Sequence, residues 1–191
     1  MLAQLIVPAA AAILGVFVGG LITFYAQRRE RRHEHARRQL ECFYGPLLAM
    51  KRQIRSKIEV QESFHRTAKT ELHKTLDEAG NDLRTREIVE KARAPKFEGV
   101  WAYSDEQLTG EIVPLYGKML EHFTQHMWLA EPSSLNHFQA LVEFVETLRR
   151  VEAKNLPHEV IDARQPGEKD LLPLYEDLES QAKRLRKELR K

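Results

Sequence analysis

The chain begins with an apolar segment long enough to cross a lipid bilayer. Residues 1–27 contain no charged side chain, and only Gln4, Thr23 and Tyr25 carry polar atoms between residues 2 and 26. A helix over those positions is about 37 Å long, whereas the hydrocarbon core of a bilayer is about 30 Å thick. The segment therefore predicts a transmembrane anchor at residues 1–27, to which the rest of the chain is attached as a domain.

A cleaved secretory signal peptide is the alternative interpretation of this segment. Signal peptides place basic residues before a shorter apolar core of about 7–15 residues. Here the order is reversed, because no Lys or Arg precedes the apolar run and the basic residues begin at Arg28. We therefore favour an anchor that is retained in the mature protein.

Six arginines follow the apolar segment closely and predict how the chain is oriented in the membrane. Arginine-rich flanks remain on the cytoplasmic side, so the N-terminus is expected outside and the C-terminal domain in the cytoplasm. This pattern predicts a single-pass protein of the cell inner membrane. The residues expected to set the topology and to contact the lipid bilayer are Arg28, Arg29, Arg31, Arg32, Arg37 and Arg38.

Small side chains recur at every fourth position of the predicted anchor. Ala11, Gly15, Gly19 and Thr23 would share one helical face, on which Gly15 and Gly19 form a Gly-x-x-x-Gly pair. Small residues allow the backbones of two membrane helices to approach closely, and this packing drives helix association in lipid. The face predicts that the anchors of several copies pack together in a homo-oligomer.

Charge is distributed unevenly along the remainder of the chain. Residues 28–55 carry a net charge of +6 and residues 183–191 carry +5, whereas the intervening residues 56–182 carry −9. A surface that is mostly acidic repels phosphate, so nucleic acid is an unlikely partner. The basic ends suit an anionic membrane surface better. The single cysteine, Cys42, rules out an internal disulfide and is typical of a reducing cytosolic compartment.

Downstream of the anchor, apolar residues recur at intervals of three or four, which is typical of amphipathic helices. No segment alternates with a period of two, so no sheet is expected. The sequence thus predicts an all-α protein with one N-terminal transmembrane helix, a basic helical stalk at residues 28–45 and an irregular cytosolic bundle of about five or six helices. This bundle, residues 46–191, is expected to end in a coiled-coil-like helix with a basic tail.

Turn signals suggest where the helices of the bundle begin and end. A kink or turn is expected at Gly45-Pro46, ahead of a long helix. Residues 95–103 are expected to form a loop whose aromatic side chains either plug the open end of the core or form a binding surface, and we favour the plug. Ser104 followed by Gln107 matches a capping box, which predicts that a new helix begins there.

The second half of the bundle is expected to contain a helical hairpin. The clearest amphipathic pattern lies at residues 135–153, and this helix should pack antiparallel to the one before it. A short helical piece is predicted at residues 158–164. The last helix is predicted to start near residue 170.

His122, His126 and His137 are the best candidate metal ligands. Histidines four residues apart on a helix point to the same side, as zinc sites require, and His137 follows the next predicted turn. However, the glutamate of a His-Glu-x-x-His metalloprotease is missing, and no phosphate-binding or dinucleotide-binding glycine motif occurs. We interpret Cys42 as a packing residue. The protein is therefore predicted not to be an enzyme and to hold no cofactor, and a metal-dependent hydrolase at the three histidines is the alternative.

The chain also shares short features with a loose group of proteins. These features are Phe43-Tyr44-Gly45-Pro46-Leu47, Trp101, His137, Leu156-Pro157 and Leu174-Tyr175 with Leu178. The layout resembles bacterial and prophage proteins that have a single membrane anchor, a charged stalk and an all-helical cytosolic domain. The resemblance implies no activity, but it implies a bacterial inner membrane and a phage-defence or mobile-element setting.

The leading functional hypothesis from the sequence is an oligomerising helical scaffold or effector anchored in the membrane. Its cytosolic domain would bind a protein partner or signal, and binding would be coupled to assembly of the membrane helix. Besides the hydrolase, a membrane-permeabilising effector built from several copies of the first helix is the other alternative.

Overall fold

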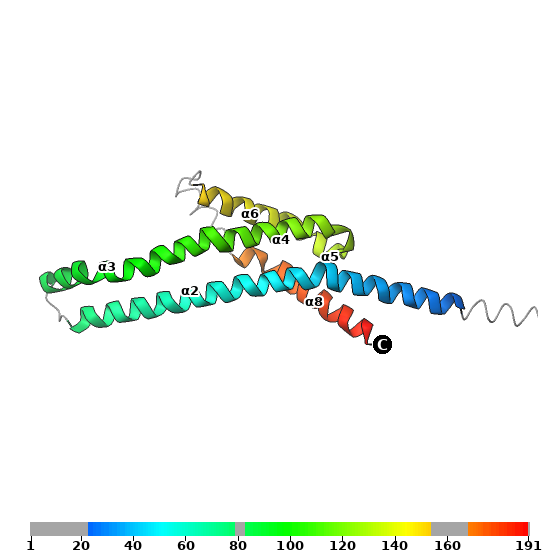
Figure 1. Ribbon diagram of the computed structural model, residues 1–191, viewed down its shortest axis with the longest axis horizontal. Helices are drawn as coiled ribbons and strands as arrows, with labels where there is room; N and C mark the ends of the chain where they lie inside the picture. Colours follow the sequence, from blue (N-terminus) through cyan, green and yellow to red (C-terminus); the bar gives the residue numbers. More distant parts are fainter. Residues whose placement is uncertain (1–22, 79–82, 154–167, 191) are drawn as a thin grey trace, which may run out of the picture.

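The computed structural model describes residues 23–78, 83–153 and 168–190, and nearly all of them are helical (Figure 1). No strand occurs among these described residues. The predicted all-α class is therefore confirmed. The short helical piece predicted at residues 158–164 lies outside the described residues.

A long, nearly straight rod forms the backbone of the molecule. It consists of a helix over residues 23–39, here called the N-terminal helix, then the π-helix η1 (Leu40–Tyr44), then α2 (Gly45–Glu78) (Figure 1). The kink predicted at Gly45-Pro46 is absent from this described rod. One wide π turn takes its place, because Pro46 has no N–H and a proline ring collides with the carbonyl four residues earlier in a regular α-helix.

A second rod returns antiparallel to the first. It contains α3 (Leu83–Gln107), the π-helix η2 (Leu108–Ile112) and α4 (Val113–His126) (Figure 1). The π-helix η2 ends two residues before Pro114, as η1 ends two residues before Pro46, so both wide turns accommodate a proline. Gly110 and Pro114 thus alter the helix without breaking it.

The loop predicted at residues 95–103 is wrong, because α3 continues through it with Pro95 inside the helix. The capping box is wrong for the same reason. Ser104 lies in the interior of α3, where its Oγ donates to the carbonyl oxygen of Val100 at 2.9 Å. A serine hydroxyl that bonds back to the preceding turn is an alternative to capping that sequence spacing cannot distinguish.

The remaining elements cover the middle of the two rods. After η3 (Met127–Leu129) the chain forms the short α5 (Pro132–Leu135) and then α6 (Phe138–Glu152), which packs along α4 (Figure 1). The helix predicted at residues 135–153 is therefore largely α6. The last elements are η4 (Glu168–Leu171) and α8 (Leu172–Leu189), and α8 contacts η1, α2 and α5.

The hydrophobic core lies where η1, α4, α6 and α8 meet the start of α2. Phe43 and Tyr44 are fully buried there, and Phe43 makes edge-on ring contacts with both Tyr44 and Phe123. A buried network of hydrogen bonds also connects α5 and α8 to η1 in this core. The Tyr44 hydroxyl accepts the backbone N–H of Glu131 and pairs with the Ser134 hydroxyl, which donates to Asp177.

The membrane anchor predicted from the sequence is not supported. In the part of the chain that the structure describes, no helix is both long and apolar enough to cross a lipid bilayer. The N-terminal helix, for example, carries eight charged side chains, which are costly in hydrocarbon. This finding contradicts the predicted localisation as a single-pass inner-membrane protein with its N-terminus outside. Ala11, Gly15 and Gly19 lie outside the described residues, and Thr23 is the first residue described.

Candidate functional site

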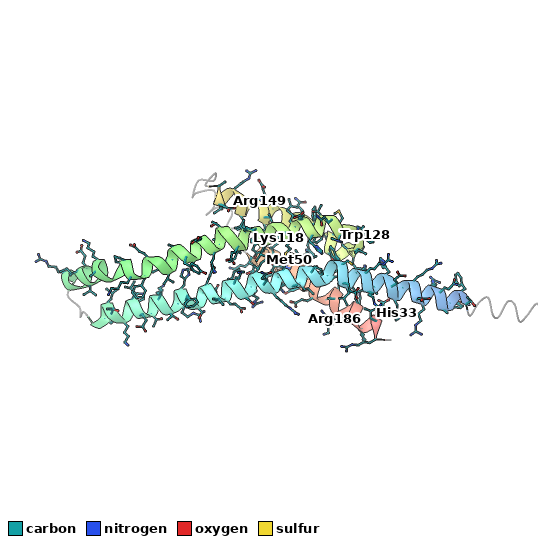
Figure 2. The ribbon with its side chains drawn as sticks, in the orientation of Figure 1. His33, Met50, Lys118, Trp128, Arg149 and Arg186 are labelled. Carbon is teal, nitrogen blue, oxygen red and sulfur yellow. The ribbon has the colours of Figure 1, made fainter. Side chains whose placement is uncertain are left out.

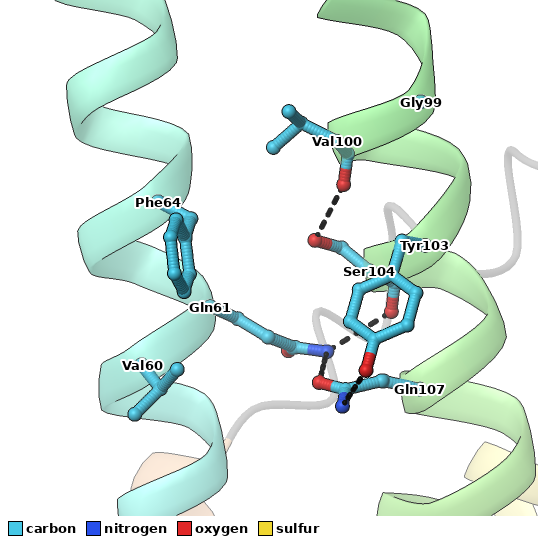
Figure 3. A pocket seen from close by; sticks show the side chains of 8 residues that line it. All are labelled: Val60, Gln61, Phe64, Gly99, Val100, Tyr103, Ser104 and Gln107. Atoms are coloured by element: carbon cyan, nitrogen blue, oxygen red, sulfur yellow. Dashed lines mark hydrogen bonds between the residues drawn. The ribbon is translucent and has the colours of Figure 1, made fainter.

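The two rods extend beyond the core as a pair of helices, and among the described residues no third helix lies against them. We call this part the arm, and it comprises residues 56–78 of α2 and residues 83–107 of α3 (Figure 1). The arm contains a groove of about 370 Å³ between its helices. The residues that line the groove are Val60, Gln61, Phe64, Gly99, Val100, Tyr103, Ser104 and Gln107 (Figure 3).

Large apolar side chains of the groove face solvent. Phe64 is 63% exposed, Tyr103 is 60% exposed and Val60 is 54% exposed. Val60 and Phe64 are one helical turn apart on α2, and Tyr103 extends from α3 on the other side of the groove (Figure 3). A cluster of exposed large apolar residues in a hollow is typical of an interaction site, whereas isolated exposed apolar residues are ordinary.

The seam beneath the groove is polar. The Gln61 side-chain amide donates to the backbone oxygen of Ser104 at 3.0 Å and approaches the Gln107 side-chain oxygen at 3.5 Å (Figure 3). The Gln107 amide in turn donates to the hydroxyl of Tyr103 at 2.9 Å. These bonds fix the register of α2 against α3, but a polar layer in a helical seam stabilises it less than an apolar layer would.

The seam also buries little apolar surface. The half-buried or buried side chains described along it include Gln61, His65, Ala68 and Leu72 of α2 and Phe97, Val100, Ser104 and Gln107 of α3. Of these side chains only Ala68 and Ser104 are buried. His65 Nε2 is enclosed in the seam without a hydrogen-bond partner. The arm therefore receives little stabilisation from its own interior, since helices in water depend on packing of an apolar face.

The groove is not expected from the sequence, because a loop at residues 95–103 leaves no second helix beside this part of α2. The aromatic side chains of that segment lie on a helix. Tyr103 is largely exposed, and Trp101 is partly exposed. They therefore do not plug the end of the core. The signal that could have revealed the groove is the pair Val60 and Phe64, whose spacing of four widens the apolar face of α2 beyond the seam.

The six arginines predicted to contact lipid all lie on the N-terminal helix, and the structure brings a second basic segment next to them. The last two turns of α8 pack beside this helix, so that His33 and Arg186 appear at the same end of the molecule in Figure 2. Arg38 forms an ion pair with Glu34 at 2.5 Å, and Arg184 of α8 forms one with Glu131 at 2.7 Å.

The structure brings two of the three candidate metal ligands together. The rings of His122 and His126 are stacked with centroids 4.4 Å apart. His122 Nε2 lies 2.9 Å from the carbonyl oxygen of Cys42, and His126 Nδ1 lies 3.2 Å from the backbone oxygen of His122. His137 does not join them, since the described residues contain no group of three His, Cys, Asp or Glu that could hold a metal ion.

The contact between His122 and Cys42 follows from the proline in the first rod. Pro46 has no N–H to offer the Cys42 carbonyl four residues earlier, and the imidazole of His122 supplies a donor to it. Burial, with a smaller contribution from the neighbouring His126, lowers the pKa of His122. The hydrogen bond to the Cys42 carbonyl opposes part of this shift, but the net effect favours the neutral ring in the folded protein.

We expect His122 to make folding stability depend on pH. Because its pKa is lower in the folded state than its ordinary value of 6.5, the unfolded chain takes up the proton first as the pH falls. The contribution of His122 to the free energy of unfolding is therefore fully present above about pH 6.5. It is lost as the pH drops below that value. His122→Gln keeps an N–H for the Cys42 carbonyl but does not titrate.

Urea unfolding at pH 7.5 and pH 5.5 measures this effect. The decrease in the free energy of unfolding between the two pH values should be smaller for His122→Gln than for the wild-type protein. An equal decrease in both proteins would contradict the assignment to His122.

Ser134 and Asp177 resemble a nucleophile beside a carboxylate, but their position makes this network structural. The Ser134 side chain is completely buried, so no substrate can reach its hydroxyl. Its partner Tyr44 has a pKa raised mainly by burial, which keeps the phenol protonated and able to bond. The network joins η1, α5 and α8 and stabilises the centre of the fold.

Comparison of the chain with known protein families, curated proteins and solved structures finds no match.

Proposed function

We propose that the protein is an oligomerising helical scaffold in which two copies join through their arms. The supporting observation is the groove at Val60, Phe64 and Tyr103, where large apolar side chains are exposed above a polar seam. A second arm laid over this face would cover them and complete a four-helix bundle, since wide apolar stripes are typical of helices with more than one neighbour.

The size of the arm is adequate for a stable dimer. An arm about 35 Å long and two helices, or about 20 Å, wide offers a face of roughly 700 Å². Two such faces would bury about 1,400 Å² in total, within the range of about 1,200–2,000 Å² that is typical of stable protein interfaces. The same surface patch would serve in both copies, as in most symmetric dimers.

The charge of the arm also permits association with a second copy. Residues 56–78 and 83–107 together carry nine basic and ten acidic side chains, so two arms do not repel each other through net charge. A strongly acidic or basic partner would gain little from such a surface. Near neutrality and an apolar centre therefore favour a second copy of this chain.

Sedimentation velocity of the full-length protein tests the proposal with a matched pair of variants. Phe64→Glu would bury a carboxylate in the arm interface, and we expect dimerisation about 100-fold weaker than in the wild-type protein. Trp128→Glu makes the same change at a 66% exposed side chain outside the arm and should leave the dimer intact. Circular dichroism of both variants checks that the helices persist.

Two outcomes would contradict the proposal. The wild-type protein could sediment as a monomer at micromolar concentration. Alternatively, Phe64→Glu could remain as strongly associated as Trp128→Glu, which would place any interface outside the groove.

A further inference from the structure

A second groove lies at the opposite end of the molecule, between the N-terminal helix and the end of α8. Its volume is about 490 Å³. Its charged lining residues include Arg28, Arg31, Arg32 and His35 from the N-terminal helix and Arg184 and Glu188 from α8. An adjoining hollow of about 470 Å³ shares Arg28, Arg32 and Glu188 with it. The N-terminal helix thus lines one continuous surface with several arginines, and α8, distant in sequence, adds Arg184 and Glu188 to it.

This contact differs from ordinary packing of two helices. Arg28, Arg31, Arg32 and His35 follow the i, i+3, i+4, i+7 spacing of a single helix face. Such a face is usually apolar where another helix packs against it, yet here Ala36 is the buried apolar side chain among the groove residues. Arginines of the N-terminal helix therefore face the last turns of α8, which contribute Arg184 and Glu188 to the groove.

The acidic groups in the groove compensate only part of this charge. Glu131 accepts hydrogen bonds from Arg184 at 2.7 Å and from the buried Gln39 at 3.2 Å. Burial alone would raise the pKa of Glu131, but these hydrogen bonds outweigh it and lower the pKa, so the carboxylate is committed to Arg184. Within the described chain no ion pair involves Arg28 or Arg32.

We propose that this groove binds a phosphate-bearing anion, which links the N-terminal helix to the end of α8. Arginine forks bind phosphate oxygens in a bidentate manner, and several arginines around one anion add their contributions. The volume matches that of small-ligand sites, about 300–1,000 Å³. A long polyanion is less suitable, because residues 56–182 carry a net charge of −9 and repel it. A free polyphosphate and a lipid headgroup would both supply the required chemistry.

Isothermal titration calorimetry of the full-length protein tests this proposal with two probes at constant ionic strength. The probes are inorganic tripolyphosphate and dihexanoyl phosphatidic acid below its micelle concentration. We expect Arg28→Gln/Arg32→Gln to weaken binding at least about tenfold. Arg66→Gln/Lys69→Gln removes equal charge from the exposed face of α2 in the arm and should change the affinity less than about twofold.

The two probes separate the possible sources of the phosphate group. Tighter binding of tripolyphosphate supports a soluble polyphosphate ligand, and tighter binding of the phosphatidic acid supports a lipid headgroup. Equal affinities of the wild-type protein and Arg28→Gln/Arg32→Gln for both probes would overturn the proposal. An equal loss in the control variant would also overturn it, as would binding of single-stranded DNA without binding of either small probe.

Discussion

Replacing Phe43 by alanine should lower the free energy of unfolding by about 4 kcal/mol, because truncation of a buried phenylalanine typically costs about 3–5 kcal/mol. Phe43 has no exposed surface. Its ring lies 4.9 Å from that of Tyr44 and 5.0 Å from that of Phe123, both edge-on. The variant loses the transfer free energy of the ring and leaves a cavity where η1 packs on α4.

The position of Phe43 extends the effect beyond its own contacts. Its neighbour Tyr44 must hold its hydroxyl against the N–H of Glu131 and the hydroxyl of Ser134. A cavity beside the tyrosine ring allows that ring to move, and buried polar groups that lose their partners are costly. The substitution is therefore expected to weaken both the packing around Phe43 and the hydrogen bonds of the Tyr44 hydroxyl.

Thermal unfolding followed by circular dichroism measures the loss. A change of this size should lower the melting temperature by roughly 8–16 °C in a chain of this length. Trp128→Ala removes a larger ring that is 66% exposed and should change stability by less than about 0.5 kcal/mol. A loss below about 1.5 kcal/mol for Phe43→Ala would show that the centre of the core lies elsewhere.

Replacing Gly45 by alanine should also destabilise the protein, by roughly 2 kcal/mol. Alanine is normally the better helix former by about 1 kcal/mol, and Gly45 has ordinary helical angles, with φ −60° and ψ −53°. However, a Cβ at Gly45 would lie 2.7 Å from the carbonyl oxygen of Leu40. The π turn brings this carbonyl close, and a backbone atom cannot move aside as a flexible side chain can.

Gly110 provides the matched control, because it lies in the π-helix η2, whereas Gly45 directly follows the π-helix η1. A Cβ at Gly110 would have no other atom within 4 Å, so Gly110→Ala should stabilise the protein by about 0.5–1 kcal/mol. The two substitutions are thus expected to shift the melting temperature in opposite directions. A rise for Gly45→Ala would contradict the steric role of the π turn.

The helical class of the chain was predictable because it depends on local spacing. Apolar residues at intervals of three or four mark α6 and α8 in the sequence, and the structure has helices there. Predictions from local sequence signals failed where turn-forming residues lie inside a helix. Pro95 and Gly99 suggested a loop, but α3 runs through both residues with α2 alongside it, because the local propensity of single residues is only a weak guide to where a helix ends.

The candidate site was less predictable, since the groove is exposed only because no other described helix packs against the arm. Phe64 falls within the apolar pattern of its helix, and Val60 lies one turn before it. They are exposed because the described part of the chain places α6 and α8 against the core and no further helix against the arm. Which apolar face remains uncovered is a property of the assembled molecule.

By itself, the sequence determined that this protein is helical and that basic residues gather at both ends of its charged part. Only the tertiary structure decided that those ends meet. Contacts such as Arg184 with Glu131 and Gln39 with Leu129 join residues far apart in the chain, and they bring the N-terminal helix and α8 together. Helix formation follows from neighbours within one or two turns, whereas a groove between helices depends on long-range packing that no short segment encodes.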